Sequence, residues 1–223
     1  MNSAGDSEPR NGSAPSGRPA AAPTPVKIVV SGGFGVGKTT FVGAASEIAP
    51  VRTEEVLTAS SAGIDDLSAT PDKSTTTVAM DFGRISLRQH LILYLFGTPG
   101  QQRFWFMWDD LVRGAIGAVI LVDTRRLIES FPVIDYFERT RIPFVIGVNG
   151  FDGQFPFTEA HIREALALGP DRPVVNCDAR DTTSATRTLV TVVEHALAHS
   201  RLDIVGPSPR AVVPPEGLPD RTG

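Results

Sequence analysis

The stretch VKIVVSGGFGVGKTT, residues 26–40, joins an apolar run, a glycine-rich turn and the start of a helical pattern. Residues 32–39 match the pattern G-x-x-x-x-G-K-[ST] and follow a β-branched strand directly, which is the context that this motif requires. Such a loop turns its backbone N–H groups and the positive end of the next helix toward phosphate oxygens. The stretch therefore predicts a strand, a phosphate-binding loop and a helix, the first unit of an α/β domain.

Each position of this loop has an expected part in nucleotide binding. Lys38 would neutralise the outer phosphates, and the Thr39 hydroxyl is a predicted ligand of Mg²⁺. The other predicted binding positions contribute backbone N–H groups: Gly33, Phe34, Gly35, Val36, Gly37 and Thr40. The loop alone does not distinguish ATP from GTP, or a switch protein from a phosphotransferase.

Short apolar runs alternate with helical patterns from residue 26 to about residue 200. This alternation predicts crossover connections and a mostly parallel sheet with helices on both faces. Residues 80–86 and 90–96 are only a few residues apart, so we expect them to form a hairpin that adds one antiparallel strand. We therefore predict a P-loop α/β domain with a six-stranded sheet, and helices that begin near Lys38, Gln101, Leu127, Thr158 and Thr182.

Composition narrows the class of protein. The chain has 223 residues, of which 41% are hydrophobic, and this suits one well-buried domain. A net charge of -4 argues against a general nucleic-acid binder, which needs a basic face. We expect a disordered leader over residues 1–24, the folded domain over 25–203 and a disordered, proline-rich tail over 204–223.

The sequence also bears on location. No apolar run approaches the length of a membrane span, and the start MNSAGDSEPR is too polar for a signal peptide. The single cysteine, Cys177, excludes an internal disulfide and fits a reducing compartment. We expect a cytoplasmic protein without direct membrane insertion, recruited to membranes through partners.

Two later strands end in residues that suit recognition of a nucleotide base. The segment VIGVNGFDG carries Asn149 and Asp152 after an apolar strand. It resembles the N-K-x-D motif of Ras-like GTPases, whose aspartate pairs with two adjacent N–H donors of guanine that adenine lacks. The segment VVNCDAR ends another strand with Ala179 and Arg180. The alternative for both segments is an ordinary polar turn after a strand.

In this order along roughly residues 26–200, the motifs resemble those of the Ras-like small GTPases. The phrases KSTTTVAMDFGRI and LFGTPGQQRF are similar to bacterial MglA-type GTPases and, more closely, to the conservon GTPases of actinobacteria (CvnD-like proteins). The resemblance implies a Ras-like G domain that binds GTP or GDP with Mg²⁺. It also implies a small roadblock-type regulator as the partner, and a sensor-kinase-like membrane protein in the same complex.

The resemblance assigns roles to the residues after the last strands. Asp152 would read guanine, and the Ala179 N–H would contact guanine O6. Gly150 stands where the N-K-x-D motif of the family has a lysine whose aliphatic stem covers the base. Arg180 is the candidate to cover the ring in its place.

A polar stretch at about residues 53–77 is expected to form an irregular first switch segment. By resemblance to a T-x-x-x-D-F pattern, Thr77 is the predicted sensor of the γ-phosphate and the second protein ligand of Mg²⁺. Thr75 and Thr76 remain alternatives, and a threonine-rich strand edge is the structural alternative to a switch.

The second switch has Gly97 where the D-x-x-G pattern has aspartate. Gly100 is still expected to present its N–H to the γ-phosphate, and Gln101 matches the glutamine that orients the attacking water, which makes it the predicted catalytic residue. Antiparallel pairing of the hairpin would bring Asp81 beside Gly97, where its carboxylate would replace the missing one. A fold-stabilising carboxylate is the alternative for Asp81.

The side chains near the second switch predict slow hydrolysis that depends on a partner. Phe34 would crowd an arginine that arrives from another protein. The MglA-type branch that the chain resembles has an arginine directly before its switch threonine, where Thr76 stands here. Arg103 is a candidate substitute for that arginine, and an ordinary surface position is the alternative.

Trp105 and Phe106 fall outside the core-facing stripe of the next helix, so both are candidate anchors for the roadblock-type partner. That stripe consists of Phe104, Met107, Trp108 and Leu111. The alternative is that irregular geometry buries Trp105 and Phe106 as well.

The sequence thus predicts a GTP-binding molecular switch with slow, partner-stimulated hydrolysis in a bacterial signalling system. A nucleotide-holding scaffold with negligible hydrolysis is an alternative that Gly97 and Phe34 favour. An ATP-dependent phosphotransferase is disfavoured, because no arginine-rich lid follows the phosphate loop and because Asn149, Asp152 and Ala179 would have no role.

Overall fold

The computed structural model describes residues 22–57, 76–87 and 91–204. The backbone path alone is described for residues 52–57, 76–79, 152 and 201–204. All but the first residue of the predicted tail, nearly all of the predicted leader and most of the predicted first switch segment lie outside the described residues. Thr75 is also outside them.

One sheet organises the domain, with its strands in the order β2-β3-β4-β1-β5-β6-β7. The strands are β1 Thr24–Gly32, β2 Val51–Leu57, β3 Thr76–Leu87, β4 Leu91–Gly97, β5 Ala115–Val122, β6 Phe144–Asn149 and β7 Val174–Cys177. Strand β3 runs antiparallel to both of its neighbours, and every other neighbouring pair is parallel. The predicted mostly parallel sheet with one antiparallel strand is confirmed, and so is the hairpin.

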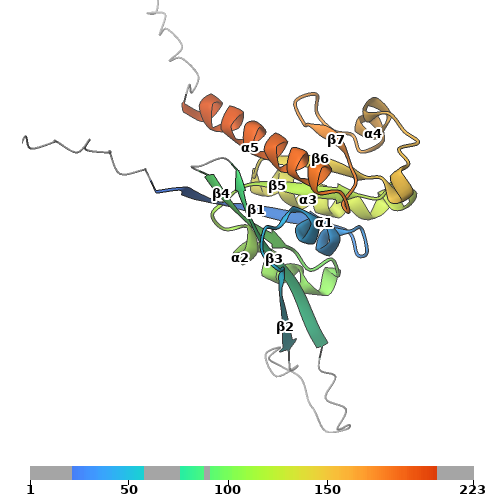
Figure 1. Cartoon of the computed structure of the whole chain (residues 1–223). Coiled ribbons are helices and arrows are strands. Elements are labelled where there is room, and N and C mark those ends of the chain that lie inside the picture. Colours follow the sequence, from blue (N-terminus) through green and yellow to red (C-terminus); the bar gives the residue numbers. More distant parts are fainter. Residues whose placement is uncertain (1–21, 58–75, 88–90, 205–223) are drawn as a thin grey trace, which may run out of the picture.

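Within the described residues the sheet contains seven strands, one more than predicted, because residues 51–57 form β2. Most of this segment belongs to the stretch predicted to be irregular. Strand β2 pairs with β3 from Val51 opposite Phe82 to Leu57 opposite Thr76. An edge strand can carry polar side chains, because its backbone hydrogen bonds hold it to the sheet. Figure 1 shows β2 and the start of β3 extending beyond the rest of the sheet.

The helices begin within a few residues of their predicted starts, and Thr158 caps one of them by accepting from the His161 N–H. The α-helices are α1 Lys38–Ala45, α2 Trp108–Val112, α3 Phe131–Thr140, α4 Glu159–Ala165 and α5 Thr182–Ile204. The 3₁₀ helices are η2 Gln102–Met107, η3 Thr124–Ser130 and η4 Phe151–Gly153. Within the described ranges, none of these helices combines the length and the apolar character that crossing a bilayer demands.

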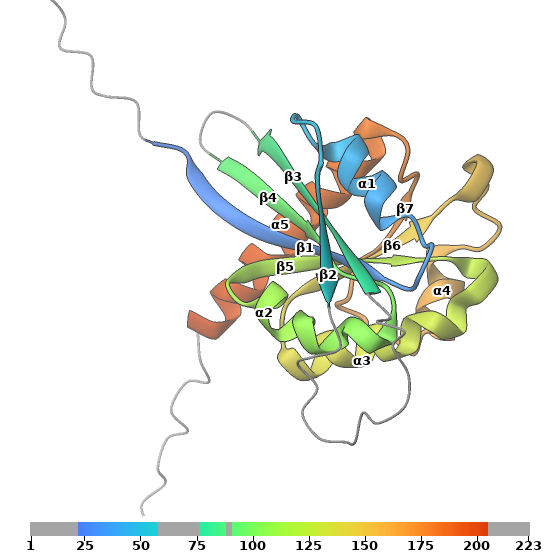
Figure 2. The ribbon, with the colours of Figure 1, turned by 90° about the horizontal axis from the view of Figure 1, so that it is seen from below.

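Helices cover both faces of the sheet. Figure 2 shows α1 and α5 on one side of it and α2 and α3 on the other. On β1, Ile28 and Val30 belong to the core cluster that includes residues of α1 and α5, while Val29 belongs to the cluster that includes residues of α2 and α3. Because both faces are buried, the central strands are nearly continuous apolar runs. The loops after the parallel strands gather at one edge, where ligand sites form in such folds.

Candidate functional site

The phosphate loop, residues 32–39, follows β1 and leads into α1. Gly32, Gly35 and Gly37 have positive φ angles of 139°, 72° and 107°, which residues with side chains rarely adopt. Space also excludes a side chain at Gly37, because a Cβ there would lie 2.7 Å from Nδ2 of Asn149. The loop therefore has the wrapped backbone of a phosphate cradle.

Lys38 lies buried at the end of this loop. Its Nζ donates to the carbonyl oxygens of Gly32 at 2.9 Å and Gly33 at 2.7 Å. Burial lowers the pKa of Lys38 to about 8, although the charges of Asp81 and Glu129 oppose that shift. A bound anion would favour the charged ammonium group, so the site is built to gain from binding phosphate.

Asp81 lies beside Gly97, the position at which the second switch lacks a carboxylate. It pairs with Gly97 in the β3–β4 ladder, and a Cβ on Gly97 would lie 3.1 Å from Cβ and 3.3 Å from Oδ2 of Asp81. The Thr39 hydroxyl donates to Oδ2 of the buried Asp81 at 2.5 Å. A hydroxyl and a carboxylate therefore meet at the end of the phosphate loop, and oxygen atoms of these kinds are the ligands that Mg²⁺ prefers.

These two residues fit an Mg²⁺ ion that takes its other ligands from water and from nucleotide phosphates. Among the described residues, no group of three or more His, Cys, Asp or Glu side chains is placed to hold a metal ion. Thr77, the other predicted ligand, pairs with Val56 in β2, four residues before Asp81. At the rise of a strand this separation is roughly 13 Å. The structure therefore does not bring Thr77 to Thr39.

The turn that follows β4 is attached to the body of the domain at two points. The Thr98 hydroxyl donates to Oγ of Ser31 at 3.0 Å, and both side chains are buried. The Trp108 indole Nε1 donates to the Pro99 carbonyl at 3.2 Å. These contacts hold the second switch without any contribution from a side chain at position 97.

Gly100 and Gln101 differ in how they approach the phosphate loop. Gly100 lies against it, since a Cβ on Gly100 would be 2.6 Å from Nζ of Lys38. The Gln101 Oε1 instead accepts from Nε of Arg103 at 2.7 Å. The Arg103 guanidinium also lies over the Phe104 ring, 4.9 Å from its centroid. Arg103 therefore holds the predicted catalytic amide in this structure.

A cavity of about 360 Å³ separates the phosphate loop from the second switch and from η3. Its lining includes Arg126 and Glu129, which sequence reasoning missed. Arg126 contacts a loop residue 92 positions earlier in the chain, and no local pattern indicates such a contact. The cavity is lined by Gly33, Phe34, Gly100, Gln101, Gln102, Trp105, Arg126, Glu129 and Val133.

Asn149 joins three loops at the edge of the sheet. Its Nδ2 donates to the Val36 carbonyl at 2.9 Å, and its Oδ1 accepts from the Ala179 N–H at 3.1 Å. The Ala179 N–H, which was predicted to contact guanine O6, donates to Asn149 in this structure. Asn149 itself fixes the spacing between the phosphate loop and the loops after β6 and β7.

An aromatic ring fills the place of the missing lysine. Gly150 has φ −79° and ψ 93°, a conformation open to any residue. A Cβ there would nevertheless lie 2.9 Å from Cε2 of Phe155, and closer still to Cζ and Cε1. Arg180, the predicted cover for the base, is held by Asp178 through contacts of 3.1 and 3.2 Å. Of Asp152, directly after this turn in η4, the backbone alone is described.

The aromatic cluster of the second switch is divided differently from the prediction. Phe104 and Trp108 are buried as predicted. Trp105, expected to face outward, packs on Trp108 with ring centroids 4.7 Å apart and contacts the core. A 3₁₀ helix has three residues per turn, so residues three apart share one side. Phe106 is 67% exposed, as expected for a partner contact.

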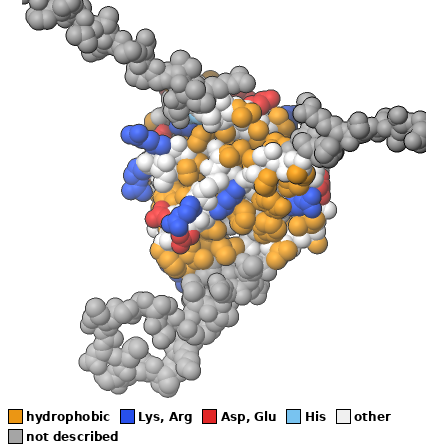
Figure 3. All heavy atoms as spheres, turned by 90° about the vertical axis from the view of Figure 1, so that its left-hand side faces the viewer, with side chains coloured by type: hydrophobic (Ala, Val, Ile, Leu, Met, Phe, Trp, Pro, Cys, Tyr) orange, Lys and Arg blue, Asp and Glu red, His pale blue; other side chains and the backbone are white. Residues whose placement is uncertain are grey.

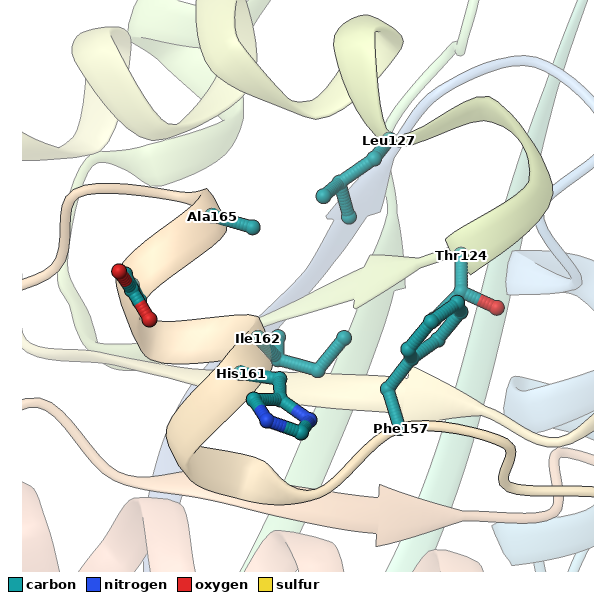
Figure 4. A pocket seen from close by; sticks show the side chains of 7 residues that line it. Thr124, Leu127, Phe157, His161, Ile162 and Ala165 are labelled. Atoms are coloured by element: carbon teal, nitrogen blue, oxygen red, sulfur yellow. The ribbon is translucent and has the colours of Figure 1, made fainter.

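A mostly apolar cavity of about 550 Å³ lies between η3 and α4. Figure 4 shows Leu127 of η3 facing Ile162 and Ala165 of α4 across this space, with Phe157 at one side. Its lining contains no residue of the phosphate loop, the second switch or the Asn149 turn. The cavity is therefore separate from the predicted nucleotide site.

A family model described as "Conserved hypothetical ATP binding protein" matches residues 30–199, a span that includes all of the loops described above. Among curated proteins, the chain is similar to the uncharacterized protein MJ1339 of Methanocaldococcus jannaschii. The two are 33% identical over 129 residues, which are 57% of this chain and 71% of that protein.

Among solved structures, the chain is similar to the G domain of the T. maritima FeoB iron transporter. The TM-score is 0.53 at 16% identity, over 79% of this chain and 99% of that chain. The cytosolic domain of the same transporter in a GDP form gives a TM-score of 0.56 at 15% identity, over 78% of this chain and 64% of that chain. At such identities the likeness shows a G-domain-like P-loop fold.

Proposed function

Because the chain belongs to the family described as conserved hypothetical ATP binding proteins, we propose a function within nucleotide binding: a GTP-binding switch with slow hydrolysis. The observation that carries the proposal is the Asn149 side chain, which bonds both the Val36 carbonyl and the Ala179 N–H. A nucleotide needs a phosphate subsite and a base subsite at a set distance, and Asn149 ties the loops that would form them.

Guanine is the proposed base because Asp152 follows Asn149 in the turn at the end of β6. Its carboxylate would be left unpaired by adenine, and an unpaired charge in a binding site is costly. The description of the family as ATP binding favours ATP as the second candidate. Both candidates use the same phosphate loop.

In the proposed reaction, a water oxygen attacks the γ-phosphorus and the bond from that phosphorus to the β–γ bridging oxygen breaks. The electron pair stays on the bridging oxygen of GDP, and the proton of the water passes to the phosphate released. Lys38 would neutralise phosphate charge and Gln101 would orient the water. Thr39 and Asp81 would hold Mg²⁺, which supplies further positive charge when bound. Gln101 must first leave Arg103, which supports a slow unassisted rate.

A switch also needs a partner protein that recognises its nucleotide state, and we propose a roadblock-type protein that contacts Phe106 and Phe34. These side chains are 67% and 63% exposed, and exposed aromatic groups near a switch suit a protein interface. Figure 3 shows one face of the molecule on which hydrophobic side chains adjoin over a broad area between scattered Lys and Arg. By the same resemblance, the complex would include a sensor-kinase-like membrane protein and would act at the cytoplasmic side.

The base is tested by denaturing the purified protein and separating the released nucleotide by chromatography. We expect GDP or GTP. ATP or ADP would overturn the guanine proposal and support the second candidate. If the protein is purified without nucleotide, titration with fluorescent GDP and ADP analogues makes the same distinction.

Hydrolysis is tested by measuring phosphate release over many turnovers, with and without a candidate roadblock partner. A switch is expected to release phosphate slowly alone and faster with the partner. Equal and negligible release in both conditions would instead indicate a scaffold that signals by nucleotide occupancy.

A further inference from the structure

Arg126 reaches the phosphate loop from η3. Its Nη2 donates to the Phe34 carbonyl at 3.2 Å and would lie 3.5 Å from a Cβ on Gly35. The backbone of η3 is kinked at this residue, with φ −139° and ψ 46° inside an otherwise 3₁₀-helical segment. The helix is thus interrupted at Arg126, whose guanidinium contacts the middle of the phosphate loop.

Two carboxylates hold Arg126 loosely. Its Nε lies 3.5 Å from Oδ2 of Asp123, and its Nη1 lies 3.4 Å from Oε1 of Glu129. Asp123 has closer contacts with Arg125, whose Nε and Nη2 donate to its two oxygens at 2.9 Å. The Arg126 side chain is 43% exposed, and long ion pairs at such exposure contribute little free energy. Arg126 can therefore exchange these partners for another anion at small cost.

The same cavity contains Arg126, Gly100 and Gln101. Gly100 adjoins Nζ of Lys38, the group expected at the outer phosphates. The space between the phosphate loop and the second switch is thus where a terminal phosphate and an attacking water would meet. Phe34 lines the same cavity and is 63% exposed, while the Arg126 guanidinium contacts the Phe34 backbone carbonyl.

We propose that Arg126 is a catalytic residue of the nucleotide hydrolysis, supplied by the chain itself. The inference rests on the proposed function. Negative charge grows on the oxygens of the transferred phosphoryl group as water attacks and the bond to the bridging oxygen breaks, and a guanidinium beside them stabilises that charge. Arg126 leaves the Phe34 carbonyl and Glu129 for these oxygens. Arg103, the arginine indicated by the sequence, is instead engaged with Gln101.

Arg126→Ala tests the inference in a single-turnover measurement of GTP hydrolysis without a partner. The rate is expected to fall by about 100-fold or more, as for other arginines that contact the transferred phosphoryl group. GDP affinity is expected to stay within about threefold, because the interaction forms in the transition state. Arg113→Ala is the matched control, since Arg113 forms an exposed pair with Asp110. Circular dichroism and thermal unfolding verify that each variant is folded.

A transition-state analogue separates catalysis from a structural role. GDP with aluminium fluoride is expected to bind the wild type and the Arg113→Ala variant without a partner, and to leave Arg126→Ala uncomplexed. Arg126→Lys should hydrolyse GTP slightly faster than Arg126→Ala, because an ammonium group keeps the charge but cannot form the bidentate contact of a guanidinium.

The outcomes are distinguishable. Unchanged hydrolysis by Arg126→Ala with normal GDP affinity overturns the inference and leaves the proposed function standing. A parallel loss of GDP affinity and hydrolysis also overturns it, because Arg126 would then only support the loop. A wild type that binds no guanine nucleotide refutes the proposed function itself.

Discussion

The phosphate end and the base end of the site each contain a glycine whose place is filled by a neighbouring side chain. Asp81 lies beside Gly97, and the Phe155 ring lies over Gly150. At the phosphate end the neighbouring side chain is a carboxylate, Asp81, which accepts from the Thr39 hydroxyl. At the base end an aromatic ring takes the place of a charged side chain with an aliphatic stem.

This contrast follows from what each end has to bind. A metal ion and phosphates need oxygen ligands and charges of a given sign, so only another carboxylate can replace the missing one. A base needs a flat apolar cover, and an aromatic ring stacks on any base. The ring at the base end would therefore add affinity without choosing between guanine and adenine, and in the proposed function that choice would fall to Asp152.

The largest effect is expected when the substitute carboxylate is removed. Asp81→Ala should weaken Mg²⁺-dependent nucleotide binding by about 10- to 100-fold, a typical result when a carboxylate that supports a metal site is lost. Titration of a fluorescent GDP analogue with and without Mg²⁺ measures this. The double variant Asp81→Ala, Gly97→Asp returns a carboxylate from the other strand and should recover part of the affinity. An unchanged Mg²⁺ dependence in Asp81→Ala would show that Asp81 does not replace the carboxylate missing at Gly97.

At the base end, placing the lysine of the N-K-x-D motif at position 150 should destabilise the fold. Gly150→Lys forces a side chain into the Phe155 ring and should reduce the free energy of unfolding by about 1–3 kcal/mol, the usual cost of overpacking. Chemical denaturation measures the loss. Adding Phe155→Ala removes the clash and should restore stability. If Gly150→Lys is as stable as the wild type, Phe155 does not fill the lysine position.

Only the phosphate end should respond to mildly alkaline pH. The pKa of Lys38 is about 8 in the free protein, so its charge is lost as the pH rises through that value. Nucleotide affinity should fall about fivefold between pH 8 and pH 9, if the bound state keeps the proton. Between about 8 and 10.5 the folded free protein binds fewer protons at Lys38 than the unfolded chain, so this group raises stability with pH, the opposite direction to affinity.

Lys38→Arg is the control for the pH experiment, because arginine stays charged throughout this range. Its affinity should be lower at every pH but flat from pH 8 to pH 9. A wild-type affinity that is equally flat would show that Lys38 remains charged in the free protein.

The smallest effect is expected at Arg103. Arg103→Ala releases Oε1 of Gln101 and should speed single-turnover hydrolysis by about threefold, in keeping with one exposed hydrogen bond. Arg113→Ala serves again as the control. A slower rate in Arg103→Ala would mean that Arg103 places Gln101 productively.

The features that the sequence predicted correctly are encoded by residues that lie close together in the chain. The glycine-lysine pattern before α1, the close spacing of β3 and β4 and the Thr158 cap each depend on a few adjacent residues. Asn149 was predicted as part of a base motif, but its bonds to Val36 and Ala179 cross 113 and 30 positions and could not be read from the pattern.

The features that the sequence did not reveal depend on geometry that a periodic pattern does not encode. The position of Arg126 in the site depends on the kink in η3 and on a contact with a residue 92 positions away. The prediction placed Trp105 outside the core-facing stripe because it assumed an α-helix with 3.6 residues per turn. Helix η2 is instead a 3₁₀ helix, which has a tighter turn. Phe155 has its place because the turn through η4 returns the chain over Gly150.

The chain has two tryptophans, and both lie at the turn of the second switch. Trp108 is bonded to the Pro99 carbonyl, and the Trp105 ring is 4.7 Å from it. All of the indole emission of the protein therefore originates at one place, next to Gly100. The molecule has a built-in optical probe, and its ultraviolet fluorescence reports the movement of this turn without an attached dye.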